Sequence, residues 1–435
     1  MPDTLLSDFL RAATWHGPLD DARRILLEHP SLPASSLHAA AVLGDEELVR
    51  GFLGRDPAGV RALAGPYEAP PLVYLCLSRF LRLDPSAGDA FVRTATLLLD
   101  AGADPNGGFW TRGANPEFET PLYGAAGVAQ HAPLTRLLLE RGADPNDGEV
   151  AYHSPESYDL AAMQAVVETG RVTPDSLVLM LVRKCDWHDL AGARYLLEHG
   201  ADPNGRWGRP GFTPLHHAIA RDNARVMLEM MLDHGGDPAQ EYGGMTAVAR
   251  AARRGRSDLL ELFDAREFST ALQGVDALIE ACARNEPESI KALVTRSPGL
   301  VDELRALGAT LLADFAANGN SDGVERLLDL GVPVDVPHPG DGFWDYAAGC
   351  TALHVAAWRG RHQVVATLLR RGAAVNALDE QGRTPLQLAV RACVDSYWMR
   401  HRAPDSVAAL LAAGAHREGV RLPTGYDAID RLLAG

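Results

Sequence analysis

The chain has few cysteines and few aromatic residues, and it contains no long apolar run. Its five cysteines are widely spaced, odd in number and without a C-x-x-C pair, which argues against a disulfide framework and a zinc ribbon. We therefore expect each cysteine to be a small buried residue in a reducing, cytoplasmic compartment. No window reaches roughly 18 uninterrupted apolar residues, and the first residues lack the pattern of a secretory signal, so we expect no membrane partner.

Basic residues are the scarcer charged class. The chain holds 41 Lys and Arg against 57 Asp and Glu, a formal net charge of -16 at pH 7. Contacts to phosphates need clustered Lys and Arg, so this balance argues against a nucleic-acid partner.

Signatures of common catalytic sites are missing as well. The chain has no G-x-S-x-G, no G-x-x-x-x-G-K-[ST], no H-E-x-x-H, and no G-x-G-x-x-G after a predicted strand. We therefore predict no catalytic residue, no metal and no cofactor, and we do not expect an enzyme.

The length excludes one simple core. A chain of 435 residues exceeds the roughly 250–300 residues at which a single core stops growing. Hydrophobic residues make up 46% and charged residues 23%, so the chain is neither disordered nor fibrous. It must hold several domains or a repeat array that grows by stacking.

A short phrase that ends helices recurs along the chain. Each copy follows an apolar run at helical spacing, its Gly can adopt the left-handed geometry of a helix end, and the following Pro prevents continuation. Asp and Asn in the phrase can satisfy backbone amides of the turn. Gly-Ala-Asp-Pro-Asn occurs at 102–106, 142–146 and 200–204, and looser versions begin at Gly235, Gly331 and Gly372.

A second phrase begins the next helix. Thr caps that helix, Pro in its first turn needs no amide partner, and a His two residues after the Pro can link neighbouring turns by hydrogen bonds. The spacing from Thr213 to Thr246 equals that from Thr351 to Thr384. The phrase begins at Thr120, Thr213, Thr246, Thr351 and Thr384.

The two phrases together resemble the ankyrin repeat, whose period of about 33 residues and T-P-L-H-x-A signature they match. The resemblance implies an all-α solenoid of about twelve helix-turn-helix units with β-turn or hairpin loops. The chain is also similar to bacterial ankyrin proteins that end in L-P-T-G-Y-x-x-I-D-x-L-L, and here that tail predicts a capping helix. Repeats are expected to begin near Leu5, Ser35, Ala69, Thr120, Val150, Ser176, Thr213, Thr246, Gly274, Thr310, Thr351 and Thr384.

One segment interrupts the pattern. Residues Phe263–Gly274 lack the helix-ending phrase, so they form either a kink between two stacks or a repeat with a bent loop. We therefore divide the chain into an N-terminal stack, 1–263, and a C-terminal stack, 264–435, and expect them to form one continuous solenoid.

Two polar motifs have a structural and a functional interpretation. Adjacent histidines such as His216 and His217 point about 100° apart on a helix, which disfavours a shared metal. The sequence Trp187-His188-Asp189 occupies an inter-helix turn. For both motifs the structural interpretation is favoured.

Three linkers are long and rich in aromatic residues: 107–119, 205–212 and 336–349. Long loops in compact repeats often carry function, and exposed aromatic side chains are favoured at binding hot spots. Alternatively, these rings pack the loops against each other. The candidate contact residues are Phe109, Trp110, Trp207, Phe343 and Trp344.

Arginines gather at the predicted ends of the first helices. They are either solvated helix ends or a basic stripe in a groove that accepts an acidic or extended partner segment. The candidates are Arg221, Arg253, Arg254, Arg359, Arg383 and Arg391, together with Trp358. Residues 394–404, inserted within the last full repeat, could form a second contact point.

These observations predict a scaffold or adaptor that binds a protein partner of unknown identity and acts as a monomer. A regulatory or inhibitory subunit uses the same binding surface and is the first alternative. The second is an enzyme or small-molecule sensor built on His338, Asp341 and Asp345 in the last aromatic loop.

Overall fold

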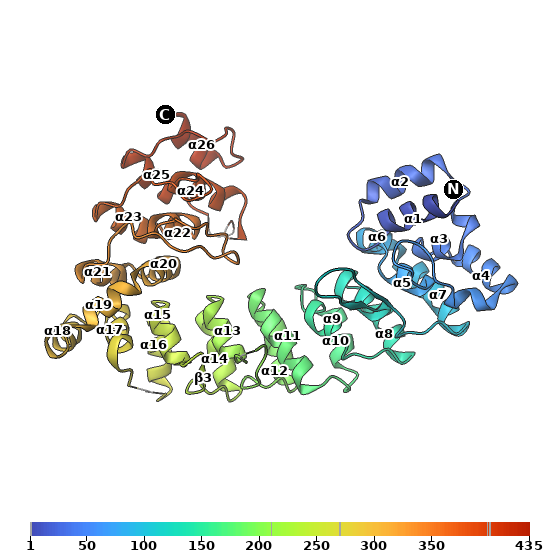
Figure 1. Cartoon of the computed structure of the whole chain (residues 1–435), viewed down its shortest axis with the longest axis horizontal. Helices are drawn as coiled ribbons and strands as arrows, with labels where there is room; N and C mark the ends of the chain where they lie inside the picture. The colour runs from blue at the N-terminus through green and yellow to red at the C-terminus, as the bar shows by residue number, and fades with distance from the viewer. Residues whose placement is uncertain (1, 210, 269–270, 398, 400–401) are drawn as a thin grey trace. The chain divides into compact units, whose positions relative to one another are not determined.

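The computed structural model describes residues 2–209, 211–268, 271–397, 399 and 402–435, and these are mostly helical (Figure 1). The chain divides into two compact parts. We call them the N-terminal body, which runs to His217 and includes Asp233–Gly236, and the C-terminal body, which holds Ala218–Leu232 and Asp237–Gly435. The boundary predicted at 263 from the sequence stays a prediction.

The N-terminal body is built from successive helix pairs. In it, first helices contact first helices and second helices contact second helices, as in α3 with α5 and α4 with α7. Its α-helices are α1 (Pro2–Ala13), α2 (Leu19–Glu28), α3 (Leu37–Val42), α4 (Glu46–Arg55), α5 (Pro71–Cys76), α6 (Arg79–Leu83), α7 (Gly88–Asp100), α8 (Ala132–Glu140), α9 (Gly148–His153), α10 (Ala161–Val167), α11 (Pro174–Asp186) and α12 (Leu190–Glu198). Short 3-10 turns η1 (Pro33–Ser35), η2 (Pro57–Arg61) and η3 (Pro85–Ala87), a π-helical turn η4 (Tyr123–Val128), and the antiparallel hairpin β1 (Phe109–Trp110) and β2 (Phe118–Glu119) complete it.

The C-terminal body repeats the arrangement, with α20 against α22 and α22 against α24. Two helices, α13 (Pro214–Ala220) and α14 (Arg225–Asp233), lie where the two parts of the chain are divided. Then follow the hairpin β3 (Glu241–Tyr242) and β4 (Met245–Thr246) and the helices α15 (Ala247–Arg253), α16 (Ser257–Ala265), α17 (Gly274–Ala283), α18 (Pro287–Arg296), α19 (Leu300–Ala306), α20 (Gly308–Asn318), α21 (Ser321–Asp329), α22 (Ala352–Trp358), α23 (His362–Arg370), α24 (Pro385–Val394), α25 (Asp405–Ala412) and α26 (Asp427–Ala434).

A helix pair starts within a few residues of every predicted repeat start, which confirms the predicted all-α solenoid of helix pairs. The tail also forms the predicted helix, α26, which contacts α25 and buries Ile429 and Leu433. All five cysteines are buried, as expected from their apolar surroundings. The inserted segment 394–404 lies between α24 and α25, but 398, 400 and 401 lie outside the described residues, and its role stays a prediction.

The helix-ending phrase works as its residues predict and also joins neighbouring repeats. Gly102 has a φ of 94°, a conformation that residues with a Cβ resist. The carboxylate of Asp104 accepts from the Asn106 amide within the same turn, at 2.9 Å. The Asn106 side chain then donates to Gly142 O and accepts from Asp144 N of the next turn, at 3.0 and 2.8 Å. This phrase therefore ends a helix and also links two neighbouring repeats by hydrogen bonds.

The helix-starting phrase gives a second link. Thr384 Oγ1 accepts from Gln387 N at 3.2 Å, which caps α24. In α22, His354 Nδ1 accepts from Thr351 N at 3.1 Å and its Nε2 donates to Arg383 O, also at 3.1 Å. The predicted histidine link between neighbouring turns is confirmed here.

Candidate functional site

The hairpin of the N-terminal body separates its two aromatic residues. Phe109 pairs with Glu119 and Trp110 with Phe118 across the two strands. Because successive strand residues point to opposite faces, Phe109 is buried while Trp110 is 64% exposed. Of the two predicted contact residues in this loop, Trp110 is therefore the one that a partner can reach.

The buried side of this hairpin forms the wall of an aromatic pocket. The ring of Phe109 stacks on Tyr67, with centroids 4.8 Å apart, and Trp15 meets Phe109 edge-on at 6.0 Å. Trp15 Nε1 donates to the Tyr123 hydroxyl at 3.1 Å, which fixes the indole. The open cavity has a volume of about 690 Å³ and is lined by Arg11, Trp15, Pro66, Tyr67, Glu68, Gly108, Phe109, Trp110, Thr111 and Arg112.

Two residues of this aromatic pocket have unusual backbone conformations. Trp15 has a φ of 53° and Glu68 a φ of 49°, in the left-handed region that is costly for bulky residues. His188 and Asp222, in turns of other repeats, share this conformation, so it belongs to the repeat turns and does not by itself mark the pocket. Sequence analysis missed Trp15 and Tyr67 because each is an isolated aromatic residue in a degenerate repeat.

The second aromatic linker, 205–212, forms a tight turn. Trp207 N donates to Phe212 O at 2.9 Å and Phe212 N to Trp207 O at 3.0 Å, an isolated bridge that closes the turn. The Trp207 side chain is half-buried. It stays a predicted contact residue.

The third aromatic linker, 336–349, folds back onto its own body. Trp344 and Trp358 are each only 8% exposed, and Trp358 Nε1 donates to Trp344 O at 2.9 Å. Phe343 is 46% exposed, with the Arg221 guanidinium 3.5 Å from its ring centroid. The packing interpretation therefore holds for Trp344. Trp358, predicted to face the groove beside the arginines, is buried too, so the prediction that either ring is a surface contact needs correction.

The prediction that Arg254 and Arg359 belong to a basic stripe facing a partner also needs correction. Arg254 and Arg359 both pair with Asp222, at 2.6 and 3.0 Å. The side chains of Asp222 and Arg359 are 1% exposed and that of Arg254 is 14% exposed. Buried guanidinium groups need counter-charges, so these arginines hold the body together instead of facing a partner.

Asp222, Arg254, Asp314 and Arg359 form one ion-pair cluster, called here the Asp222 cluster. The pKa values of its two carboxyl groups are shifted in opposite directions. Burial raises the pKa of Asp222, but the charges of Arg254 and Arg359 outweigh burial and lower it to about 2. For Asp314, which lies 2.8 Å from Arg254, burial dominates and raises the pKa to about 6. Asp222 is thus the main counter-charge of the cluster.

Three further candidate arginines are paired as well, and the exposed fractions of their side chains are 31% for Arg253, 15% for Arg383 and 43% for Arg391. Arg253 pairs with Asp276 at 2.6 Å. Arg383 contacts Asp379 at 2.7 Å and Asp345 at 3.2 Å, and Asp345 also lies 2.6 Å from Arg391. Partner binding by these three arginines stays a prediction, and an incoming acidic segment would have to compete with the existing carboxylates.

The residues of the predicted sensor are engaged within their own loop or by arginines. His338 Nδ1 accepts from Gly340 N at 3.0 Å, and Asp341 Oδ1 accepts from Phe343 N at 2.9 Å, both within the loop. Asp345 is engaged by Arg383 and Arg391. Each of the three is used in holding the loop.

The two polar motifs of the N-terminal body are structural, as favoured from the sequence. His216 is buried beside Thr213 Oγ1 at 2.8 Å, whereas His217 Nε2 lies 2.7 Å from Asp186. Asp189 caps α12 by accepting from Gly192 N, and it pairs with the buried Lys184 at 2.6 Å.

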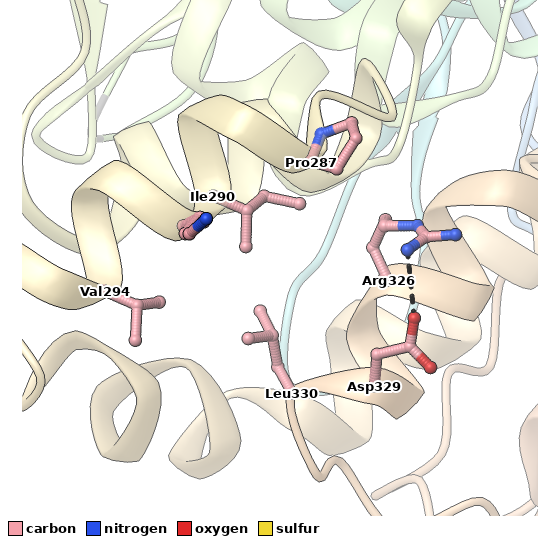
Figure 2. A pocket seen from close by; sticks show the side chains of 7 residues that line it. Pro287, Ile290, Val294, Arg326, Asp329 and Leu330 are labelled. Carbon is pink, nitrogen blue, oxygen red and sulfur yellow. Dashed lines mark ion pairs between the residues drawn. The ribbon is translucent and has the colours of Figure 1, made fainter.

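A smaller hollow lies on the C-terminal body between α18 and α21 (Figure 2). It has a volume of about 220 Å³, and Ile290, Val294 and Leu330 form its apolar lining. The one ion pair drawn there joins Arg326 to Asp329 at 3.0 Å. Pro287 and Lys291 complete the lining.

Within the described part of the chain, no helix combines the length and apolarity that a membrane crossing requires.

Comparison with known proteins gives matches to two family models and to several relatives. The model for "Ankyrin repeats (3 copies)" matches residues 316–416, and that for "Ankyrin repeats (many copies)" matches 181–232. The chain is 27% identical over 280 residues to ankyrin repeat domain-containing protein SAT10 of Stachybotrys chartarum, covering 64% of this chain and 12% of that protein. It is 38% identical over 77 residues to potassium channel AKT1 of Oryza sativa subsp. indica and subsp. japonica, covering 18% of this chain and 8% of each channel.

The chain therefore spans only a small part of the length of these curated relatives. Among solved structures, it is similar to the human ASB11 ankyrin repeat domain, with 23% identity and a TM-score of 0.27. That match covers 61% of this chain and 98% of the other.

Proposed function

This chain is an ankyrin-repeat protein, and from that premise we propose that it is a scaffold that binds a protein partner at the aromatic pocket of its N-terminal body. Ankyrin repeats are generally protein–protein interaction modules, because stacked repeats present an extended surface. The proposal includes action as a monomer in a reducing, cytoplasmic compartment. A regulatory or inhibitory role would use the same contact and would differ in its effect on the partner's activity.

The observation that carries the proposal is the exposure of Trp110 at the rim of a large cavity. A ring that is 64% exposed leaves much apolar surface in water, and burying it against a partner is favourable. Trp and Arg are enriched in binding hot spots, and Arg11 and Arg112 line the same pocket. An extended segment with an apolar side chain and flanking carboxylates fits this combination.

Replacing Trp110 by alanine should weaken partner binding about 30-fold or more, the loss typical of a hot-spot residue. The partner is first identified by affinity capture and mass spectrometry, and its Kd is then measured with purified proteins. The Tm of the variant should equal that of the original protein, because the ring is mostly in solvent.

Leu378→Ala is the control, since it removes another apolar side chain, 63% exposed, from the C-terminal body. It should leave the Kd unchanged. Equal affinity of the Trp110→Ala variant would rule out the aromatic pocket as the contact site. Failure of the full chain to capture any protein reproducibly would contradict the scaffold role itself.

A further inference from the structure

Three glutamates of the N-terminal body bring their carboxylates together beside the hairpin. Glu119 lies on β2, Glu117 precedes that strand, and Glu149 is in the first turn of α9. One carboxylate oxygen from each lies within 4.8 Å of those of the other two. Calcium–oxygen bonds are about 2.3–2.6 Å long, so oxygens on opposite sides of one Ca²⁺ are about 5 Å apart. The three carboxylates are therefore close enough to share one ion.

Glu119 gives a second observation that points to a ligand. Glu119 is only 1% exposed, and its buried Oε2 has no hydrogen-bond partner. A buried carboxyl group without a partner is costly. A cation bound beside Glu119 Oε2 would give this oxygen a partner.

The basic groups nearest to Glu119 pair with other carboxylates, although the charge of His153 still acts on Glu119. His153 contacts Glu149 through Nε2 at 3.3 Å and Glu156 through Nδ1 at 3.0 Å. Arg183 pairs with Glu156 and with Asp186. Asp147, which caps α9, adds a further carboxylate to the surroundings.

We propose that Glu117, Glu119 and Glu149 bind one Ca²⁺, which joins the hairpin to α9. The donors are all oxygen atoms, which suit hard cations. Two of them come from a loop and a short strand, and such adaptable ligands suit the variable coordination of Ca²⁺ better than the near-ideal octahedron that Mg²⁺ demands. The remaining coordination positions would be filled by water. The ion neutralises Glu119 and orders linker 107–119.

The test is isothermal titration calorimetry of the full chain with CaCl₂ after removal of divalent ions by a chelator. We expect one site with a Kd of about 0.1–1 mM, the weak end of calcium sites in proteins. Glu117→Gln and Glu149→Gln should each weaken binding at least about tenfold, because each removes one of the three charged ligands. Glu140→Gln on α8 is the control with the same charge change and should bind as the original protein does.

Two companion measurements separate this site from nonspecific binding and from misfolding. Calcium should raise the Tm of the original protein and of Glu140→Gln, but not of Glu149→Gln, and should slow amide hydrogen exchange in 107–119. Glu117 is exposed, so Glu117→Gln provides a variant that folds even if Glu119→Gln does not. The proposal is overturned by an absence of heat and of any Tm change in millimolar CaCl₂, by equal binding to all variants, or by tighter binding of MgCl₂.

Discussion

Replacing Asp222 by asparagine should lower the free energy of unfolding of the C-terminal body by about 3–5 kcal/mol. The carboxylate is the shared partner of Arg254 and Arg359, and the substitution leaves two buried guanidinium groups with too little negative charge. Arg254 would keep Asp314, whereas Arg359 would lose its carboxylate. Native-state hydrogen exchange of α15 and α22 measures the loss in the body concerned, without assuming that the whole chain unfolds in one step.

Two comparisons make this prediction specific. Asp264→Asn breaks the pair with Arg284, but Asp264 is 53% exposed, so the loss should stay below about 1 kcal/mol. Because the pKa of folded Asp222 is lowered to about 2 from an ordinary 3.8, its stabilisation is present above pH 4 and is lost as pH falls towards 2. The difference between the original protein and Asp222→Asn should therefore shrink over that range. Equal losses for the two variants at neutral pH would contradict a structural role for the cluster.

Replacing Trp358 by alanine should cost the same body about 3–5 kcal/mol, as for large aromatic residues in other cores. Its ring lies in a buried cluster with Trp344, Tyr346 and Leu388. The indole also holds the linker through its hydrogen bond to Trp344 O. We therefore expect faster hydrogen exchange and proteolysis in 336–349, measured together with the loss of stability.

Trp358→Phe provides the matched variant, since it keeps an aromatic ring and removes the indole donor. It should lose less stability than Trp358→Ala but should still loosen the linker. A Trp358→Ala variant that unfolds and exchanges like the original protein would show that this linker does not depend on the buried ring.

The repeats could be predicted because their signals are local. A Gly that adopts a positive φ and a Thr that caps the next helix act within a few residues of chain. The histidine link between turns follows from the same short phrase. Such features depend little on what the rest of the chain does, so the helix pairs begin close to where the phrases indicate.

The paired arginines could not be predicted in the same way. Asp222 meets Arg359 across 137 positions of sequence, and only the stacking of repeats brings them together. Asp222 also has a φ of 52° at the end of α13, which no phrase in the sequence announces. An arginine at the end of a first helix looks the same whether its partner is solvent or a buried carboxylate.

The two Gly-Phe-Trp triplets show how context decides exposure. In the first, strand pairing buries Phe109 and leaves Trp110 in solvent. In the second, a tight bridge between Asp341 and Tyr346 turns Trp344 inward and leaves Phe343 half-exposed. Identical residues thus have opposite roles, because the turn that carries them sets which ring faces the helices.

Hydrogen exchange of the chain with and without its captured partner tests most directly whether the aromatic pocket is the binding surface. Binding there should slow exchange at the amides of 67–68 and 108–112, which line the pocket. Protection confined to 336–349, with exchange at the pocket unchanged, would contradict it.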